Sequence, residues 1–187
     1  MSKKVVVVYH SGFGHTARQA EHVFNGAAAV DGVDALRVSV EDVDAHWDDL
    51  AAADAIIFGA PTYMGSVSAP FKAFMDASSK VWFTQGWKDK LAAGFTNSAS
   101  QSGDKLNALL QMMVFSGQHA MVWVSLGLPP GNNASTGSVD DLNRIGSYAG
   151  AMAQSNADEG AEAMRESDLK TAEHLGRRVA EMALRMG

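Results

Sequence analysis

The sequence predicts an α/β fold, with helices on both faces of a doubly wound, five-stranded parallel sheet. Short apolar runs without polar alternation recur along the chain, and such runs are typical of strands buried on both faces. Segments with apolar residues at helical spacing lie between them, which indicates parallel strands joined by crossover helices. We expect the strand order 2-1-3-4-5, with ligands beyond the carboxyl ends of strands 1 and 3.

Length and composition restrict the class of protein. The chain has 187 residues and a hydrophobic content of 47%, which suits one domain over residues 1–187 with a substantial core. The net charge of −6 argues against nucleic-acid or anionic-membrane partners. Because there is no cysteine, thiol redox chemistry is excluded, and a redox function needs a bound cofactor. No apolar run suits a signal peptide or a membrane span, so we expect a cytoplasmic protein.

The first half of the chain is expected to hold three strands. Val5–Tyr9 and Ala55–Ala60 are continuous apolar runs and predict buried strands, whereas Asp34–Val40 alternates and predicts a strand nearer an edge. Pro70 lies near the start of a helical pattern, where its missing N–H is tolerated. The helices expected in this half cover residues 17–29, 47–52 and 66–79.

The second half of the chain is expected to add two strands and two helices. The expected elements are strands over 91–96 and 119–126, a polar loop at 97–103, and helices over 104–115 and 168–186. Ser167 is the expected N-cap of the last helix. Residues 127–167 exceed the roughly 12–15 residues usual for a loop, so we expect a lid or a subunit contact there. Tyr148 is our candidate for a residue of this segment that reaches the site.

A glycine-rich loop at 11–16 follows the first strand and precedes a helix. Free N–H groups and the positive end of the helix dipole converge at such a point, which predicts a phosphate site. The residues assigned to it are Ser11, Gly12, Phe13, Gly14, His15 and Thr16. We favour a terminal monophosphate because two hydroxyl groups flank the glycines. There are two alternatives. The loop matches the dinucleotide fingerprint G-x-G-x-x-A, so it could bind a dinucleotide, or it could be a purely structural turn.

A second loop, at 61–65, follows the third strand. Pro61 fixes a turn and Gly65 frees one, so successive backbone N–H groups between them can face the edge of a flat heteroaromatic ring. Thr62 lies in this loop, and Tyr63 or Met64 can form a wall beside the ring. An ordinary strand-to-helix connection is the alternative.

A third loop leaves the strand at 91–96. Its residues are small and polar, which suits hydrogen bonds to the pyrimidine side of a flavin or to its ribityl chain. A solvated loop without a ligand would have the same composition. The residues assigned to binding are Asn97, Ser98, Ala99, Ser100, Gln101 and Gly103.

Together the three loops resemble those of the flavodoxin-like FMN-dependent NAD(P)H:quinone oxidoreductases, the tryptophan-repressor-binding-protein type, and the related NADPH-dependent FMN reductases. The resemblance covers nearly the whole chain and rests on Ser11–Thr16 and on Phe58–Thr62 with Gly65. Trp82 and His119 fall where that family carries a tryptophan and a histidine that line the flavin site. The chain departs from the family at Tyr63, Met64 and Ser66, and its third loop has less glycine.

The resemblance implies non-covalently bound FMN and two-electron, ping-pong transfer from NADH or NADPH to a quinone or similar acceptor. It also implies a homo-oligomer, a dimer or a tetramer, in which neighbouring subunits complete the site. No catalytic side chain is required, because the flavin carries the chemistry. No metal site is expected, since the acidic stretch at 44–49 lacks convincing ligand spacing. A flavodoxin-type one-electron carrier is the alternative.

Overall fold

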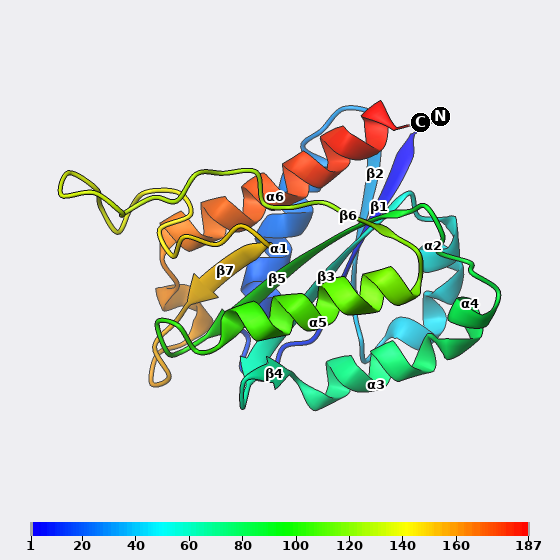
Figure 1. Ribbon diagram of the computed structural model, residues 1–187, viewed down its shortest axis with the longest axis horizontal. Coiled ribbons are helices and arrows are strands. Elements are labelled where there is room, and N and C mark those ends of the chain that lie inside the picture. The colour runs from blue at the N-terminus through cyan, green and yellow to red at the C-terminus, as the bar shows by residue number, and fades with distance from the viewer. Residues whose placement is uncertain (1, 187) are drawn as a thin grey trace.

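The computed structural model describes residues 2–186. Among these residues, seven strands form one sheet, and helices cover both of its faces (Figure 1). In chain order the elements are β1 (Lys3–Tyr9), α1 (His15–Ala28), β2 (Val33–Ser39), the 3-10 turn η1 (Val43–Ala45), α2 (Trp47–Ala52), β3 (Ala55–Tyr63), β4 (Ser66–Val67), α3 (Ala69–Ala77), α4 (Ser79–Phe83), β5 (Leu91–Ser98), α5 (Lys105–Gln118), β6 (Val122–Trp123), β7 (Ala151–Gln154), the 3-10 turn η2 (Ala161–Ala163) and α6 (Glu166–Arg185).

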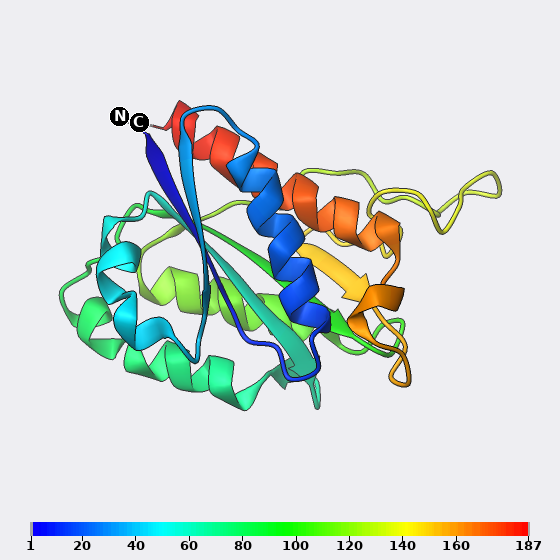
Figure 2. The ribbon, with the colours of Figure 1, turned by 180° about the vertical axis from the view of Figure 1, so that it is seen from behind.

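The central strands are apolar on both sides because a helical layer covers each face of the sheet. Val6 and Val8 of β1 point into a core shared with α2, α3 and α5. Val5 and Val7 point into a second core, shared with α1 and α6. The two helical layers are visible in Figures 1 and 2. This arrangement confirms the predicted α/β fold and explains why β1 shows no polar alternation.

The sheet has more strands than the sequence predicts. Its main path runs β2-β1-β3-β5-β6, and all neighbours on this path are parallel. β4 adds an antiparallel pair to β3, and β7 pairs in parallel with β5. The expectation of five strands is therefore wrong for residues 2–186, although the five strands that were expected lie in the expected order along the main path.

Two short strands share the edge of the sheet beside β5. Leu91 and Ala92 pair with β6, whereas Phe95–Ser98 pairs with β7. Between these two pairings the chain leaves the sheet and forms the yellow-green excursion at the left of Figure 1. The strand expected over 119–126 is thus reduced to Val122–Trp123, and the segment at 127–167 contains a strand rather than loop alone. The segments that form this edge are selected by pairing with a strand that is distant in sequence. A local apolar pattern does not predict such pairing.

The helix expected over 66–79 is divided into a hairpin and two short helices. Met64 and Gly65 have positive φ values of 49° and 75°. Two consecutive residues with positive φ form the tight turn that joins antiparallel strands, so the chain folds back and β4 pairs with the end of β3. The helical pattern of the sequence begins only after this turn, at Ala69.

The closing helix begins two residues earlier than the sequence predicts. α6 starts at Glu166, and the expected N-cap, Ser167, lies inside its first turn. The Ser167 hydroxyl donates instead to the carbonyl oxygen of Val139, at 2.8 Å, and so ties the excursion to α6. None of the helices in residues 2–186 combines the length and the apolar character needed to cross a membrane.

Helices α1 and α6 pack against each other through glycine (Figure 2). A Cβ atom on Gly26 would overlap the carbonyl oxygen of Glu173 in α6, and one on Gly176 would overlap that of Val23 in α1. Both obstacles are backbone atoms, which cannot rotate away. The two glycines therefore set how closely the helices of this layer approach.

We expect Gly176→Ala to lower the free energy of unfolding by about 1–3 kcal/mol, because an over-packed site forces backbone shifts. Gly117→Ala in α5 is the matched control, since no atom lies within 4 Å of the added Cβ. The control should leave stability unchanged or raise it by up to about 1 kcal/mol. Urea denaturation measures both variants, and equal stabilities would contradict the close approach of α1 and α6.

Candidate functional site

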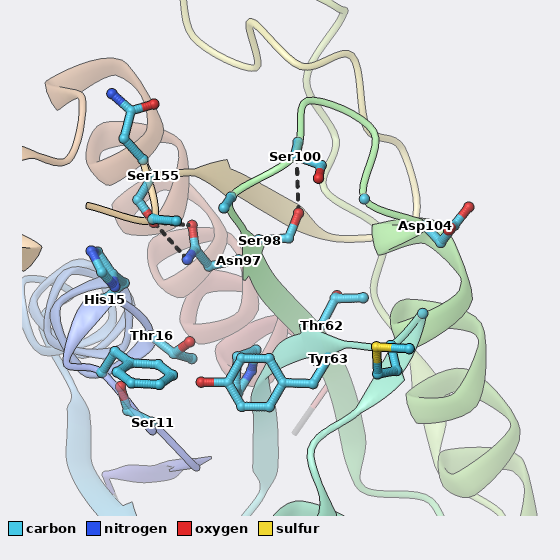
Figure 3. A pocket seen from close by; sticks show the side chains of 18 of the residues that line it. Ser11, His15, Thr16, Thr62, Tyr63, Asn97, Ser98, Ser100, Asp104 and Ser155 are labelled. Carbon is cyan, nitrogen blue, oxygen red and sulfur yellow. Dashed lines mark hydrogen bonds between the residues drawn. The ribbon is translucent and has the colours of Figure 1, made fainter. Parts of the chain in front are cut away.

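One cavity of about 850 Å³ lies beyond the carboxyl ends of β1, β3 and β5 (Figure 3). The three loops singled out in the sequence meet there. Their lining residues are Ser11, Phe13, His15, Thr16, Pro61, Thr62, Tyr63, Met64, Gly65, Asn97, Ser98, Ala99, Ser100 and Gly103. Gly12, Gly14 and Gln101 belong to the same loops without lining the cavity. The cavity volume falls within the 300–1,000 Å³ that is usual for sites of small molecules and cofactors.

The first loop presents the positive end of a helix to the cavity. Gly14 adopts φ 89° at the N-cap of α1, and its N–H donates to the Ser11 hydroxyl at 3.1 Å. The first turn of α1 carries no acidic residue to neutralise the helix end. Thr16, in this turn, is buried and lines the cavity. Unpaired N–H groups at such a terminus favour an anion.

The second loop places Tyr63 over the first. The Tyr63 ring meets Phe13 edge-to-face, with ring centroids 6.3 Å apart. A Cβ on Gly12 would lie 2.6 Å from the Tyr63 hydroxyl oxygen, so this approach requires glycine. Burial raises the pKa of the Tyr63 hydroxyl, and a hydrogen bond from the Gly12 N–H opposes that shift. Tyr63 therefore stays neutral, whereas Met64 beside it is fully exposed at the rim.

The third loop is held from behind by a buried lysine. Lys105, the first residue of α5, is only 1% exposed. Its ammonium donates to the Ser98 hydroxyl at 2.8 Å and to the carbonyl oxygens of Ser100 and Gln101 at 2.9 and 3.0 Å. Burial lowers the pKa of Lys105 to about 8. Sequence reasoning missed this residue because a lysine at a helix start normally faces solvent.

A fourth segment, following β7, completes the wall of the cavity. Its lining residues, none of which the sequence predicted, are Ser155, Asn156, Ala157 and Glu159. The side chains of Asn97 and Ser155 hydrogen-bond each other, with the amide nitrogen 2.8 Å from the hydroxyl. A ring nitrogen of His15 lies 3.0 Å from the carbonyl oxygen of Glu159. The available signal was the short apolar run of 149–153 followed by polar residues, which reads as a strand end. Asp104, at the start of α5, also lines the cavity and was missed.

A buried ion pair anchors this fourth segment. Arg144 donates to both carboxylate oxygens of Asp168, at 2.8 and 2.6 Å, and both side chains are at most 5% exposed. The same carboxylate accepts the backbone N–H of Gln154 at 3.0 Å, and the Gln154 side chain donates to the Ala99 carbonyl at 3.0 Å. The excursion, α6, β7 and the third loop are thus joined by one polar network. Such a pair is costly to break because one charge would remain buried alone.

Three residues predicted to wall the site lie away from it in this chain. Trp82 and His119 line a second, smaller depression together with Ser78. Tyr148 is 64% exposed and lies outside both hollows. α5 runs antiparallel to the strands, so His119, just after its end, lies at the amino edge of the sheet, opposite the cavity. The described chain by itself therefore does not bring these three side chains to the cavity.

His119 is a buried, neutral histidine. The Ser78 hydroxyl donates to the Met75 carbonyl at 2.7 Å, so it accepts the Nε2–H of His119, 2.9 Å away. Nδ1 has no hydrogen-bond partner among residues 2–186. The ring lies beside Trp87 and Phe115, whose ring centroids are 4.4 and 4.9 Å from that of His119. Burial lowers the pKa of His119 to about 4.

Stability should therefore depend on His119 at mildly acidic pH. The pKa is depressed in the folded state, so the unfolded chain binds a proton at residue 119 between pH 6.5 and 4 while the folded chain does not. Stability is lost as the pH falls through this window. Between pH 7 and pH 4 we expect the free energy of unfolding of His119→Gln to fall by about 2–3 kcal/mol less than that of the wild type. Denaturation at a series of pH values measures the difference, and parallel profiles would contradict it.

Among residues 2–186, no group of three or more His, Asp or Glu side chains is placed to hold a metal ion. The polar side chains that line the cavity carry hydroxyls, amides, two carboxylates and the imidazole of His15, and the lining residues include no lysine or arginine. The arrangement can bind an anion through neutral donors and the helix end, and a flat ring between the loops.

Comparisons with known proteins indicate the family of the chain. The family model described as NADPH-dependent FMN reductase matches residues 37–129. A Pseudomonas aeruginosa protein named flavodoxin FldP is 46% identical over 181 residues, which cover 95% of each chain. An Archaeoglobus fulgidus NAD(P)H dehydrogenase (quinone) is 32% identical and covers 96% of this chain and 97% of its own. The structure of a flavodoxin, WrbA-like protein from Agrobacterium tumefaciens superposes with a TM-score of 0.79 at 44% identity, covering all of both chains.

The fold and the loops define a flavodoxin-like redox protein. The chain belongs to the flavodoxin-like family of FMN-dependent NAD(P)H:quinone oxidoreductases, as the sequence resemblance predicts. The names of its relatives divide between flavodoxin at 46% identity and quinone-reducing enzymes at about 30%.

Proposed function

We propose that the chain binds FMN in this cavity and passes two electrons from NADH or NADPH to a quinone or similar acceptor. The observation that carries the proposal is the convergence of the three loops on one cavity at the carboxyl ends of parallel strands. The residues present fit the cofactor, because an un-neutralised helix end suits its phosphate and a loop of backbone N–H groups suits its ring. Membership of the family supports the same cofactor.

In this proposal the first loop holds the phosphate. Ser11 and Thr16 donate their hydroxyl hydrogens, and the backbone of 12–15 supplies N–H groups, with Gly12 and Gly14 allowing the close approach. No cationic side chain is required, since the helix end and several neutral donors share the negative charge. Phe13 and His15 flank the bound group.

The second and third loops hold the ring. FMN, when bound, supplies the redox chemistry by accepting and returning two electrons. The N–H groups of Thr62–Gly65 would stabilise negative charge that develops on the ring, because donors fixed in advance stabilise such charge best. Asn97–Gln101 and Gly103 orient the polar side of the ring and the ribityl chain. Tyr63 and Met64 shape the rim through which donor and acceptor enter in turn.

Other parts of the proposal rest on the family resemblance. We propose a single domain over residues 1–187, in a homo-oligomer whose neighbouring subunits bring further residues to the open rim. Trp82 and Tyr148 are candidates for that contribution, because they are exposed and lie away from the cavity of their own chain, whereas His119 is buried. A cytoplasmic location stays a prediction.

Binding measurements test the phosphate assignment. Thr16→Val removes one hydroxyl at nearly constant shape, so we expect FMN affinity to fall about tenfold, the usual worth of a hydrogen bond to a charged group. Riboflavin, which lacks the phosphate, should bind the variant and the wild type equally. Thr84→Val, at an exposed position outside the cavity, is the control. Unchanged FMN affinity in Thr16→Val would contradict the assignment, and no binding of FMN by the wild type at micromolar concentration would overturn the proposed function.

A second candidate function is a flavodoxin-type carrier that passes single electrons between proteins. The relative at 46% identity, which is named a flavodoxin, favours it. Steady-state oxidation of NADH and NADPH with benzoquinone by the FMN-loaded protein separates the two functions. We expect saturable turnover with parallel double-reciprocal lines, as in a ping-pong mechanism. Absence of turnover, together with two resolved one-electron steps in a potentiometric titration, would favour the carrier.

A further inference from the structure

We infer that Lys105 is a positioning residue that holds the third loop in its ligand-binding conformation, and that its positive charge couples this loop to pH. The inference rests on the proposed function for the identity of the ligand, FMN. The contacts of Lys105 themselves do not depend on it.

The geometry shows that Lys105 acts through the loop rather than on the ligand. Lys105 does not line the cavity, whereas Ser98, Ala99 and Ser100 do. Its ammonium lies behind these residues and makes three hydrogen bonds, one to a hydroxyl and two to backbone carbonyls. An ammonium has three N–H donors, so this set uses all of them.

The carbonyl contacts also fix the direction of the loop amides. A trans peptide unit points its N–H opposite to its C=O. Because the Ser100 and Gln101 carbonyls accept from Lys105, the N–H groups of Gln101 and Ser102 point away from the ammonium. Gly103 and Asp104 then take positive φ values of 55° and 54° and lead into α5. Asp104 is not a glycine, so this conformation needs tertiary contacts to persist, whereas Gly103 adopts it freely.

The charge of Lys105 is balanced by neighbours on other elements. The Asp168 carboxylate of α6 raises the pKa of Lys105, but burial, which is the largest effect, and the Arg144 guanidinium of the excursion both lower it. Asp168 is already engaged by Arg144, so it offers Lys105 little compensation. The ammonium is consequently held mainly by the loop oxygens, which become the groups most affected when it loses a proton.

Deprotonation should loosen the loop. A neutral amine retains two N–H donors for three acceptors and loses the charge that strengthens each bond. If the bound ligand needs the ordered loop, binding favours the charged lysine, and affinity falls once the pH exceeds the pKa of the free protein. A lysine that only filled space in the core would give no such dependence.

The test compares FMN and riboflavin binding to the full chain between pH 7 and 9.5. At pH 7 we expect Lys105→Met to bind both flavins at least about tenfold more weakly than the wild type, because several charge-assisted hydrogen bonds are lost. Wild-type affinity for both should fall about tenfold per pH unit above pH 8, whereas the variant should be insensitive to pH. Lys170→Met, at a lysine whose side chain is 60% exposed on α6, is the control and should follow the wild type.

Hydrogen exchange of the flavin-free protein gives a second reading that needs no ligand. We expect the backbone amides of residues 98–104 to exchange faster in Lys105→Met than in the wild type. In the wild type, exchange of these amides should accelerate above pH 8 by more than the intrinsic rise of the exchange rate with pH. If Lys105→Met does not fold, Lys105→Gln takes its place. If neither variant folds, the pH dependence of exchange and of flavin binding in the wild type tests the inference.

Equal affinity of the variant and the wild type at pH 7, or identical pH profiles, would overturn the inference. Failure of the wild type to bind FMN would overturn the proposed function instead, while exchange would still test the role of Lys105.

Discussion

Burial of β1, β3 and β5 on both faces is the constraint on which the site depends. Helices must cover each face, so each strand is followed by a chain segment that crosses back to start a parallel neighbour. The carboxyl ends of all three strands then meet at one edge of the sheet, and so do the loops that leave them. The cavity at that edge follows from the packing of the core, because three loops distant in sequence have no other reason to meet.

The walls of the cavity depend on polar groups that carry a cost. Lys105 and the pair of Arg144 with Asp168 are charges removed from water, and each is tolerated only because its hydrogen bonds are satisfied. Their role is to order segments with little apolar surface of their own, the third loop and the chain after β7. A binding loop must expose small polar groups to its ligand. Contacts on the side of the loop that faces away from the ligand therefore have to make it rigid.

Much of the fold and part of the site could be predicted. The buried strands, the helices at 47–52 and 168–186 and the three loops are expressed in local patterns of apolar residues, Gly and Pro. The hairpin at Met64–Gly65 was missed because a helix pattern resumes just after it. β7 was missed because the apolar run at 149–153 is short and therefore a weak strand signal, and its pairing with β5 supplies what the pattern lacks.

The assignment of individual side chains to the site was less predictable. Trp82 and His119 occur in the expected sequence context, yet they lie in a separate depression. For His119 the reason is the direction of α5, which places the end of this helix at the other edge of the sheet. Ser155, Asn156, Ala157 and Glu159 line the cavity, although the only sequence signal near them is the short apolar run that precedes them. Sequence spacing shows which residues directly follow a strand. It does not show which residues after a later strand lie beside them in the folded chain.

By itself, the sequence determined the class of fold and the position of the three loops, because each is encoded within a few consecutive residues. The tertiary structure alone decided the split edge of the sheet, the fourth wall of the cavity and the part played by Lys105. These depend on contacts between residues as far apart as 144 positions, such as His15 with Glu159, or on burial that a single residue's type does not reveal. Local patterns record backbone preference, whereas burial and pairing are properties of the whole packed chain.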